Sequence, residues 1–349
     1  MRWVGGRPRT FLTRNGRVTV TRAYYHCSCG RGHAPADSAC QLPPGQATWA
    51  VQDRVALLGA WVPFRQAAKL YERMTGHEVS AGSVEHWTET VGAAAAVPPL
   101  DRYVPGPAVD TLFIQADAVM VRFDDGWHEV KVAVCWGRVG GEDLPPRYLT
   151  GQGHWDDLVE QIGDLARRQG LRRAQRVICM ADGAPAIWKV FLRLFPQAQF
   201  LLDWYHLHEH LGTVARLLPD GVAWHERQRE SLAERGPRET VAALKVLAKP
   251  GKGSRKAVRA AAQQCLGYLD SNAERLDYPT ARREGFPIGS GRVESACRMV
   301  VQQRCKQAGM CWDHGHAQAV LQARCADLNG EWDQAIQRLI AQHELARAA

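Results

Sequence analysis

Hydrophobic and polar positions follow two distinct patterns over the first hundred residues. Residues 10 to 26 alternate between the two kinds and are rich in Thr, Arg and Tyr, with Asn15-Gly16 between two runs. This pattern predicts a short β-ribbon closed by a hairpin turn, within a segment spanning residues 1–46. Residues 47–97 change to helical spacing. Helices are predicted at 50–58, from Pro63 onward, and after Ser83, which can cap residues 84–91.

Strand-like runs dominate the segment after the prolines at 98, 99, 105 and 107, which indicate a linker. Apolar, β-branched runs at 111–123 and 127–138 flank the turn sequence Asp124-Asp125-Gly126. Three strands in a meander, followed by helix, strand, helix and strand, are the order of a ribonuclease H-like core, a mixed α/β sheet in which the first and fourth strands are neighbours. The further elements predicted are strands at 147–150, 176–181 and 199–202 and helices at 156–168 and 186–194.

A long helical segment interrupts this core. Residues 222–249 are rich in Ala, Glu, Leu and Arg, and residues 255–269 form a second amphipathic stretch. We therefore expect an α-helical insertion over residues 221–284, between a first part of the core at 108–220 and its completion at 285–349. The basic loop within the insertion contains Lys252, Arg255 and Lys256, which either contact DNA backbone or form a solvated turn.

Three acidic residues stand at the ends of these elements. Asp117 lies in the first strand, Asp182 directly follows the fourth, and Glu294 opens a helical stretch after Gly289-Ser290-Gly291. A single Asp after a strand is usually a turn or cap residue. Three convergent carboxylates, however, suit two Mg²⁺ or Mn²⁺ ions, because these cations prefer oxygen ligands. Such a pair can activate a water or a 3′-hydroxyl and stabilise the leaving oxygen of a phosphodiester.

The segments around the acids resemble a known family. The run at 202–211, Leu-Asp-Trp-Tyr-His-Leu-His-Glu-His-Leu, resembles the Asp-x-x-His signature that follows the second catalytic Asp in several DDE transposase groups, including Mutator-like ones. Residues 289–295, with Gly-Met-Cys-Trp at 309–312 and Ala-Arg at 323–324, resemble the C-terminal catalytic block of insertion-sequence transposases of the ISKra type. Residues 22–37 are similar to the cysteine-bearing segment of the same group. The likeness extends from about residue 10 to about residue 335.

This resemblance implies an insertion-sequence transposase that cleaves and transfers DNA strands at terminal inverted repeats. Its partners would be double-stranded DNA, both the repeats and the target, and further copies of the chain assembled on that DNA. Asp203 and His206 would support the catalytic region or contact DNA, and Arg292 would hold a phosphate or form a surface salt bridge. The catalytic, metal-binding residues that the resemblance implies are Asp117, Asp182 and Glu294.

Two other functions account for part of the pattern. A ribonuclease H-like nuclease shares the three acids but needs neither the Asp-x-x-His signature nor the long helical insertion. A truncated or repurposed transposase that only binds DNA shares the helices and the positive charge but needs no acidic triad.

The helical unit at 47–97 resembles a helix-turn-helix, whose second member would enter the major groove. Plain packing of three helices is the alternative, because the third helix carries no Arg or Lys. If the unit reads DNA, its candidate contacts are Ser80, Ser83, His86 and Trp87.

The cysteines suggest one further site. Cys27 and Cys29 lie close to His26, His33 and Cys40, which fits either a small Zn²⁺ site or a loop with incidental thiols. Related transposases carry another cysteine pair before this point, so we expect a truncated start or a decayed site. We expect most of the remaining cysteines to be buried free thiols in a reducing cytoplasm.

Composition agrees with a nucleic-acid partner. The 349 residues include 44 Lys and Arg against 36 Asp and Glu, a net charge of +8, which suits a polyanion. The sequence contains no apolar run of about 18 residues and no apolar core of a signal peptide. We therefore expect a soluble, cytoplasmic, nucleoid-associated prokaryotic protein with no membrane partner.

Overall fold

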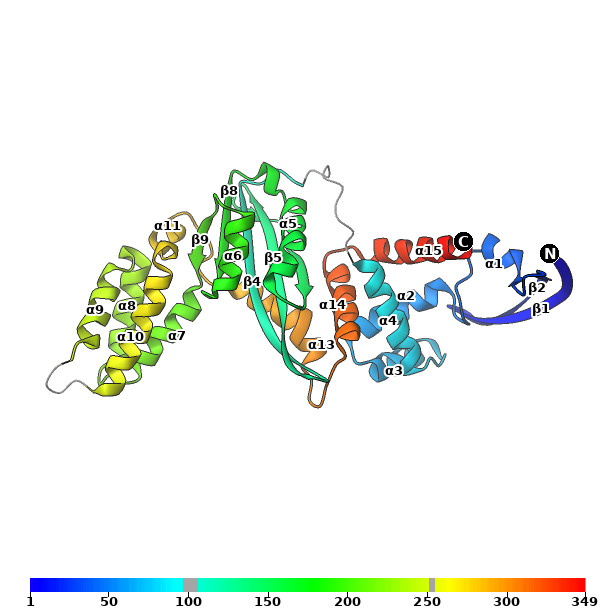
Figure 1. Cartoon of the computed structure of the whole chain (residues 1–349), viewed down its shortest axis with the longest axis horizontal. Helices are drawn as coiled ribbons and strands as arrows, with labels where there is room; N and C mark the ends of the chain where they lie inside the picture. Colours follow the sequence, from blue (N-terminus) through cyan, green and yellow to red (C-terminus); the bar gives the residue numbers. More distant parts are fainter. Residues whose placement is uncertain (97–105, 251–254, 349) are drawn as a thin grey trace. The chain divides into compact units, whose positions relative to one another are not determined.

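The computed structural model describes residues 1–96, 106–250 and 255–348, and the fold is mixed α/β (Figure 1). The chain divides into two compact units. Unit 1 contains Met1–Pro98, Met120–His128 and Met299–Ala349, and unit 2 contains Pro99–Val119 and Glu129–Arg298. Pro98, Pro99 and Pro105 of the predicted linker lie outside the described residues. None of the helices in the described ranges is long and apolar enough to cross a membrane.

The N-terminal ribbon of unit 1 is longer than predicted. Strands β1 (Arg2–Thr13) and β2 (Gly16–His26) pair antiparallel, and the short strand β3 (Gly32–His33) pairs with β2. The predicted hairpin turn is confirmed, with Gly16 at a φ of 113° directly after the two turn residues. Pairing continues beyond the expected start at residue 10 through two glycines and a proline, residues that a strand pattern does not favour.

The helices of unit 1 come from both ends of the chain. Helix α4 (Ala81–Ala95) packs on α2 (Trp49–Trp61), α3 (Phe64–Thr75), α14 (His314–Leu328) and α15 (Trp332–Ala348). The pairing of α4 with α14 is close: a Cβ atom on Gly92 would lie 1.8 Å from the carbonyl oxygen of Ala319. Residues 299–349 belong to unit 1, whereas we expected residues 285–349 to complete the core with the Glu294 helix and C-terminal helices. Two short helices, α1 (Pro35–Ala39) and α13 (Gln303–Cys305), complete the described helices of this unit.

Unit 2 is built on a mixed sheet with the strand order β6-β5-β4-β8-β9, in which β7 also pairs with β5. β4 pairs in parallel with β8, and β8 in parallel with β9, whereas β6 and β7 are antiparallel to β5. The tip of the β4–β5 hairpin, residues 120–128, belongs to unit 1. The five predicted strands are confirmed, with the bounds β4 Thr111–Phe123, β5 Gly126–Val139, β7 Arg147–Gly151, β8 Arg176–Ala181 and β9 Gln199–Leu202. The short strand β6, Glu142–Asp143, was not predicted.

The predicted insertion is helical, and Figure 1 shows α8, α9 and α10 side by side. The stretch at 222–249 forms two helices rather than one, because Gly236, at a φ of 81°, and Pro237 end the first and start the second. The described α-helices of unit 2 are α5 Val159–Arg168, α6 Pro185–Leu194, α7 Trp204–Ala215, α8 Gly221–Arg235, α9 Arg238–Ala248, α10 Lys256–Ser271, α11 Tyr278–Arg283 and α12 Gly291–Ala296. Its described 3₁₀ turns are η1 Trp155–Leu158, η2 Leu171–Arg173 and η3 Ala273–Arg275. A π-helical turn, Cys297–Gln302, follows α12.

Candidate active site

Asp117 and Asp182 stand on neighbouring parallel strands. β4 and β8 are in register up to Gln115, which lies opposite Met180. Asp117 lies two residues farther along β4, and Asp182 directly follows the end of β8, so both lie where the pairing of these strands ends. Adjacent strands are about 4.8 Å apart, so the two carboxylates share one part of the sheet. The prediction that the first and fourth strands, β4 and β8, are neighbours is confirmed.

The environment of Asp117 favours a bound cation. Burial raises the pKa of its carboxyl group, and the negative charge of Asp182 raises it further. A 2.7 Å hydrogen bond from the backbone N–H of Ala118 lowers this pKa, but not enough to cancel the rise. The second carboxylate, Asp182, accepts a hydrogen bond of 2.9 Å from the N–H of Ala184. A carboxylate whose pKa is raised by burial and by a nearby negative charge is stabilised by a bound divalent cation.

Cys297 lies between the charges of Glu294 and Asp117. It is the C-cap residue of α12, three positions after Glu294, so the two side chains lie on the same face. The Cys297 thiol donates to the Asp117 carboxylate over 3.8 Å. Burial raises the pKa of this thiol, and the charges of Asp117 and Glu294 raise it further. Glu294 on α12 and Asp117 on β4 therefore both raise the pKa of the Cys297 thiol.

The spacing of the three carboxylates bears on how many ions they could hold. Two groups of three or more ligand residues have atoms within 4.8 Å of one another among the described residues, and neither group contains Asp117, Asp182 or Glu294. A single Mg²⁺ with ligands at about 2.1 Å would bring all its oxygens within about 4.2 Å of each other. In this structure the three carboxylates therefore do not converge on one ion position.

Gln115 connects the sheet to the Glu294 helix, and its role was not predicted. It lies two residues before Asp117 and is buried. Its amide nitrogen donates to the carbonyl of Gly289 over 3.2 Å, and its amide oxygen accepts from the N–H of Val293 over 3.0 Å. Both ends of the side chain thus bind the turn and first residues that lead into Glu294.

Asp203 connects a third element to the same turn. Its side chain is fully buried and caps α7 by accepting from the N–H of His206 over 3.0 Å. The other carboxylate oxygen accepts from the N–H of Ser290 over 2.6 Å. The hydroxyl of Ser290 in turn donates to Glu294 over 2.5 Å. The Asp-x-x-His signature therefore supports the position of the third acid.

His206 and Asp203 form an ion pair, with the imidazole Nδ1–H donating to Asp203 over 2.6 Å. This hydrogen bond raises the pKa of His206 to about 9 against the effect of burial, and the charges of Asp203 and Asp182 add to the rise. Burial alone would raise the pKa of Asp203, but the hydrogen bonds from His206 and Ser290 outweigh it and lower that pKa. His206 is therefore a partly exposed cation near Asp182 at neutral pH.

Two glycines stand in the turn before Glu294, and neither Gly289 nor Gly291 has a positive φ. Gly289 is needed because a Cβ atom would lie 2.4 Å from the ring of Tyr205, whereas Gly291 faces open space. Ser290 is the N-cap residue by position, but its hydroxyl binds Glu294 and makes no cap hydrogen bond.

Arg292 makes the surface ion pair that was one of its two expected roles. Its guanidinium donates to Asp143, and it stacks 4.4 Å above the ring of Trp136. With its charge paired by Asp143, the other expected role, binding a phosphate, would require the pair to open.

The structure changes the interpretation of the helical unit. Helix α4 begins at Ala81 rather than after Ser83, because the hydroxyl of Ser80 accepts from the N–H of Ser83 and caps it. The Ser83 hydroxyl is hydrogen-bonded to Ser80. Trp87 packs against two clusters of buried apolar side chains in unit 1, one containing Val91 and the other Val84. This packing explains the position of Trp87 without a DNA contact. Of the four expected contacts, Ser80 and His86 are exposed, whereas Ser83 and Trp87 are partly buried.

The basic loop of the helical insertion contained three further expected DNA contacts. Arg255 and Lys256 are exposed at the start of α10, whereas Lys252 lies outside the described residues.

All ten cysteines are free. Cys27 and Cys29 belong to neither of the two clusters of potential metal ligands found in the described ranges.

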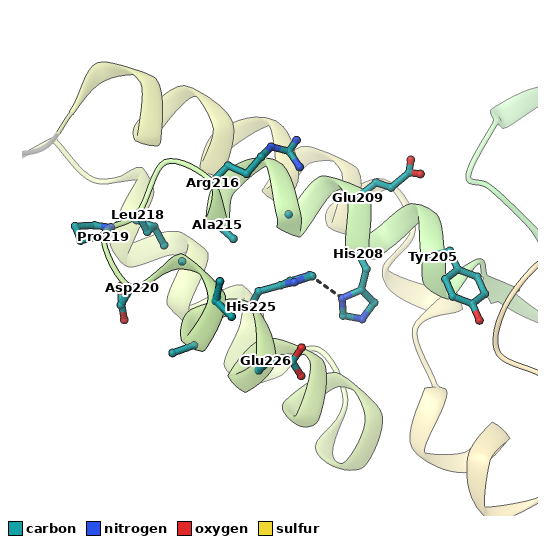
Figure 2. Close-up of a pocket in the computed structure, with 14 residues that line it drawn as sticks. Tyr205, His208, Glu209, Ala215, Arg216, Leu218, Pro219, Asp220, His225 and Glu226 are labelled. Carbon is teal, nitrogen blue, oxygen red and sulfur yellow. Dashed lines mark hydrogen bonds between the residues drawn. The ribbon is translucent and has the colours of Figure 1, made fainter.

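A cavity of about 930 Å³ lies beside α7 and α8 (Figure 2). The rings of His208 and His225 meet there, with Nδ1 and Nε2 3.0 Å apart. Burial and the neighbouring His225 lower the pKa of His208 to about 4, so this ring is neutral at pH 7. His210, two residues later, stacks instead on Tyr268 at 3.9 Å. The alternating histidines of α7 therefore point to separate partners.

Comparisons with known proteins cover almost the whole chain. A family model described as "Uncharacterised protein family (UPF0236)" matches residues 2–339. The chain is also similar to a protein of Streptococcus gallolyticus described as "UPF0236 protein in vanSb 3'region". The two are 24% identical over 344 residues, which cover 94% of this chain and 74% of the relative.

Proposed function

Because the chain belongs to the uncharacterised protein family UPF0236, we propose its function from its own site. It is a metal-dependent enzyme that cleaves and transfers DNA strands, a DDE transposase of the insertion-sequence type. The observation that carries this proposal is that Asp182, at the end of the strand beside β4, is close enough to raise the pKa of Asp117, while Asp117 and Glu294 both raise the pKa of Cys297.

The sheet supports a ribonuclease H-like core within this proposal. A hairpin and a third antiparallel strand, β4, β5 and β7, come first, and two parallel strands, β8 and β9, follow on the other side of β4. This arrangement places the first and second acids on adjacent strands. The helical segment from α8 to α11 then separates the second acid from the third.

The donor set suits Mg²⁺ or Mn²⁺. All three side chains offer carboxylate oxygens, which hard divalent cations prefer. The raised pKa of Asp117 reflects burial and the nearby negative charge of Asp182, both of which a bound cation would offset. Bound there, two such ions would activate a water or a 3′-hydroxyl and stabilise the leaving oxygen of the phosphodiester.

The protein's own contribution is to position these groups. Gln115 and Asp203 fix the turn before α12, and the Ser290 hydroxyl orients one oxygen of Glu294. His206, a half-exposed cation near Asp182, is placed to contact a DNA phosphate beside the carboxylates. The net charge of +8 favours association with DNA in general.

The test is excision of a marked element in cells. A reporter gene is placed between the genomic sequences that flank the coding region, and the full-length protein is supplied from a second plasmid. We expect excision with the wild-type protein, and none with Asp117→Ala, Asp182→Ala or Glu294→Ala. Asp220→Ala, which changes an exposed aspartate on the cavity side of α8, is the matched control and should retain excision.

Two other results would replace the proposal. Binding to the flanking DNA without any strand cleavage by the purified wild-type protein in Mg²⁺ would indicate a DNA-binding protein. Metal-dependent cleavage of RNA–DNA hybrids, with flanking DNA left intact, would indicate a ribonuclease H-like nuclease.

A further inference from the structure

A second group of metal-ligating side chains lies in unit 1, apart from the three acids. Asp125 belongs to the turn of the β4–β5 hairpin, His128 follows three residues later on β5, and His314 begins α14. One ligand atom from each lies within 4.8 Å of the other two. The imidazole Nε2 atoms of His128 and His314 lie 2.9 Å and 3.0 Å from the same Asp125 oxygen.

Backbone contacts hold the two chain segments in this arrangement. The N–H of Asp124 donates to the carbonyl of Trp312 over 3.0 Å, and the N–H of Trp312 donates to the carbonyl of Arg122 over 3.2 Å. The hairpin turn and the residues before α14 are therefore joined directly on both sides of Phe123. Asp125 and His314 are 189 positions apart in the sequence. These main-chain hydrogen bonds bring them together, so the contact does not depend on two flexible side chains alone.

An aromatic contact also fixes the orientation of His314. The Phe123 ring is buried and lies parallel to the His314 imidazole, with ring centroids 4.2 Å apart and planes at 5°. His128 meets Phe123 edge-on, with centroids 5.8 Å apart. Both imidazoles are thus oriented by the same buried side chain, which reduces the entropy lost when a ligand immobilises them.

We propose that Asp125, His128 and His314 bind a transition-metal ion of the Zn²⁺ class. Two imidazole nitrogens and one carboxylate oxygen are the ligand types that zinc prefers, whereas Mg²⁺ gains little from nitrogen ligands. A tetrahedral ion with bonds of about 2.0–2.1 Å separates its ligands by about 3.3 Å. The two nitrogens therefore need to move only a few tenths of an ångström from the Asp125 oxygen to admit the ion.

The site would be open on one side. All three side chains are roughly half exposed, so water completes the coordination. The bound ion would connect the hairpin turn to the start of α14 within unit 1, and would stabilise the folded state in proportion to its concentration above the dissociation constant.

Zinc titration of the full-length protein tests the proposal. The protein is first stripped with a chelator and then titrated with Zn²⁺ in saturating Mg²⁺, which occupies the carboxylate site. Calorimetry should detect one Zn²⁺ equivalent, and Zn²⁺ should raise Tm. His128→Asn and His314→Gln should each lose that equivalent and the rise in Tm.

Matched variants make the test specific. Asp124→Asn changes the neighbouring aspartate of the same turn, and the double variant Cys27→Ser/Cys29→Ser removes the N-terminal thiols. Both should keep the zinc equivalent. If His314→Gln is poorly folded without metal, the more exposed His128→Asn decides the result. Absence of a saturable equivalent in the wild type, its survival in both histidine variants, or its loss in the cysteine variant would overturn the assignment.

Discussion

The carboxylate of Asp203 accepts a 2.6 Å hydrogen bond from the backbone N–H of Ser290, 87 positions later in the chain. Both residues are buried. Because the Ser290 hydroxyl donates to Glu294, this bond couples the start of α7 to the third acid of the proposed active site. Asp203 is therefore a positioning residue that acts through Ser290.

Asp203→Ala should destabilise the protein and weaken metal binding together. The change leaves the Ser290 N–H and His206 without their partner, so we expect the free energy of unfolding to fall by roughly 2–4 kcal/mol. Urea unfolding measures this effect, and Mn²⁺ titration should show weaker binding. Asp277→Ala is the control, because Asp277 caps α11 in the same way but accepts from the N–H of Thr280 rather than from Ser290. Equal Mn²⁺ affinity in wild type and Asp203→Ala would contradict the positioning role.

Gln115→Ala should also displace the Glu294 turn. It removes the two hydrogen bonds to Gly289 and Val293 and leaves buried backbone groups unpaired, at a cost of roughly 1–3 kcal/mol. We expect weaker Mn²⁺ binding and slower strand cleavage at saturating DNA. Gln334→Ala, an exposed glutamine on α15, should change neither quantity. Loss of stability without any change in metal affinity would limit Gln115 to a packing role.

The His206–Asp203 pair predicts a specific dependence of stability on pH. The pKa of His206 rises from 6.5 to about 9 on folding, so the stabilisation is complete below pH 6.5 and is lost as pH rises through about 9. Asp203 stays ionised over this range because its pKa is lowered. Since 36% of the His206 side chain is exposed, we expect roughly 1 kcal/mol after solvent screening.

Unfolding of wild type and His206→Gln without divalent metal measures this contribution. The difference in unfolding free energy between them should be largest near about pH 6 and should shrink toward about pH 10. A difference that stays constant over that range would mean that His206 binds Asp203 as a neutral ring.

Asp117 predicts how metal affinity depends on pH. Burial and the charge of Asp182 raise its pKa above 3.8, and a proton on this carboxylate competes with the cation. The apparent Mn²⁺ affinity should therefore fall as pH decreases, beginning above the range in which an ordinary aspartate titrates. Isothermal titrations at a series of pH values measure this. An affinity that stays constant down to about pH 4 would contradict a role for Asp117 as a ligand.

Local patterns predicted most of the secondary structure. The strands at 176–181 and 199–202 are apolar runs of moderate length bounded by turn residues, and the structure has both with the same bounds. Strand order then sufficed to place the first and fourth strands side by side. These features depend on short-range hydrophobic patterning and on a small set of sheet topologies.

Long-range polar contacts could not be predicted in the same way. Arg324 was part of a segment assigned to the catalytic block, but it is fully buried in unit 1 and donates to the backbone carbonyls of Met299, Val300 and Ala60. Gln115 likewise has partners more than 170 positions away. A polar residue in a sequence is typical of the surface, and only the fold reveals which carbonyl groups it satisfies.

A structure of the protein with bound Mn²⁺ tests the proposed two-metal site most directly. Crystals of the full-length protein grown with Mn²⁺ should show two anomalous-scattering peaks about 3.5–4 Å apart, coordinated by Asp117, Asp182 and Glu294. The Asp182→Asn protein should lose at least one of them. A wild-type structure with no manganese at these carboxylates, or with Glu294 pointing away from an ion held by the two aspartates, would contradict the two-metal mechanism.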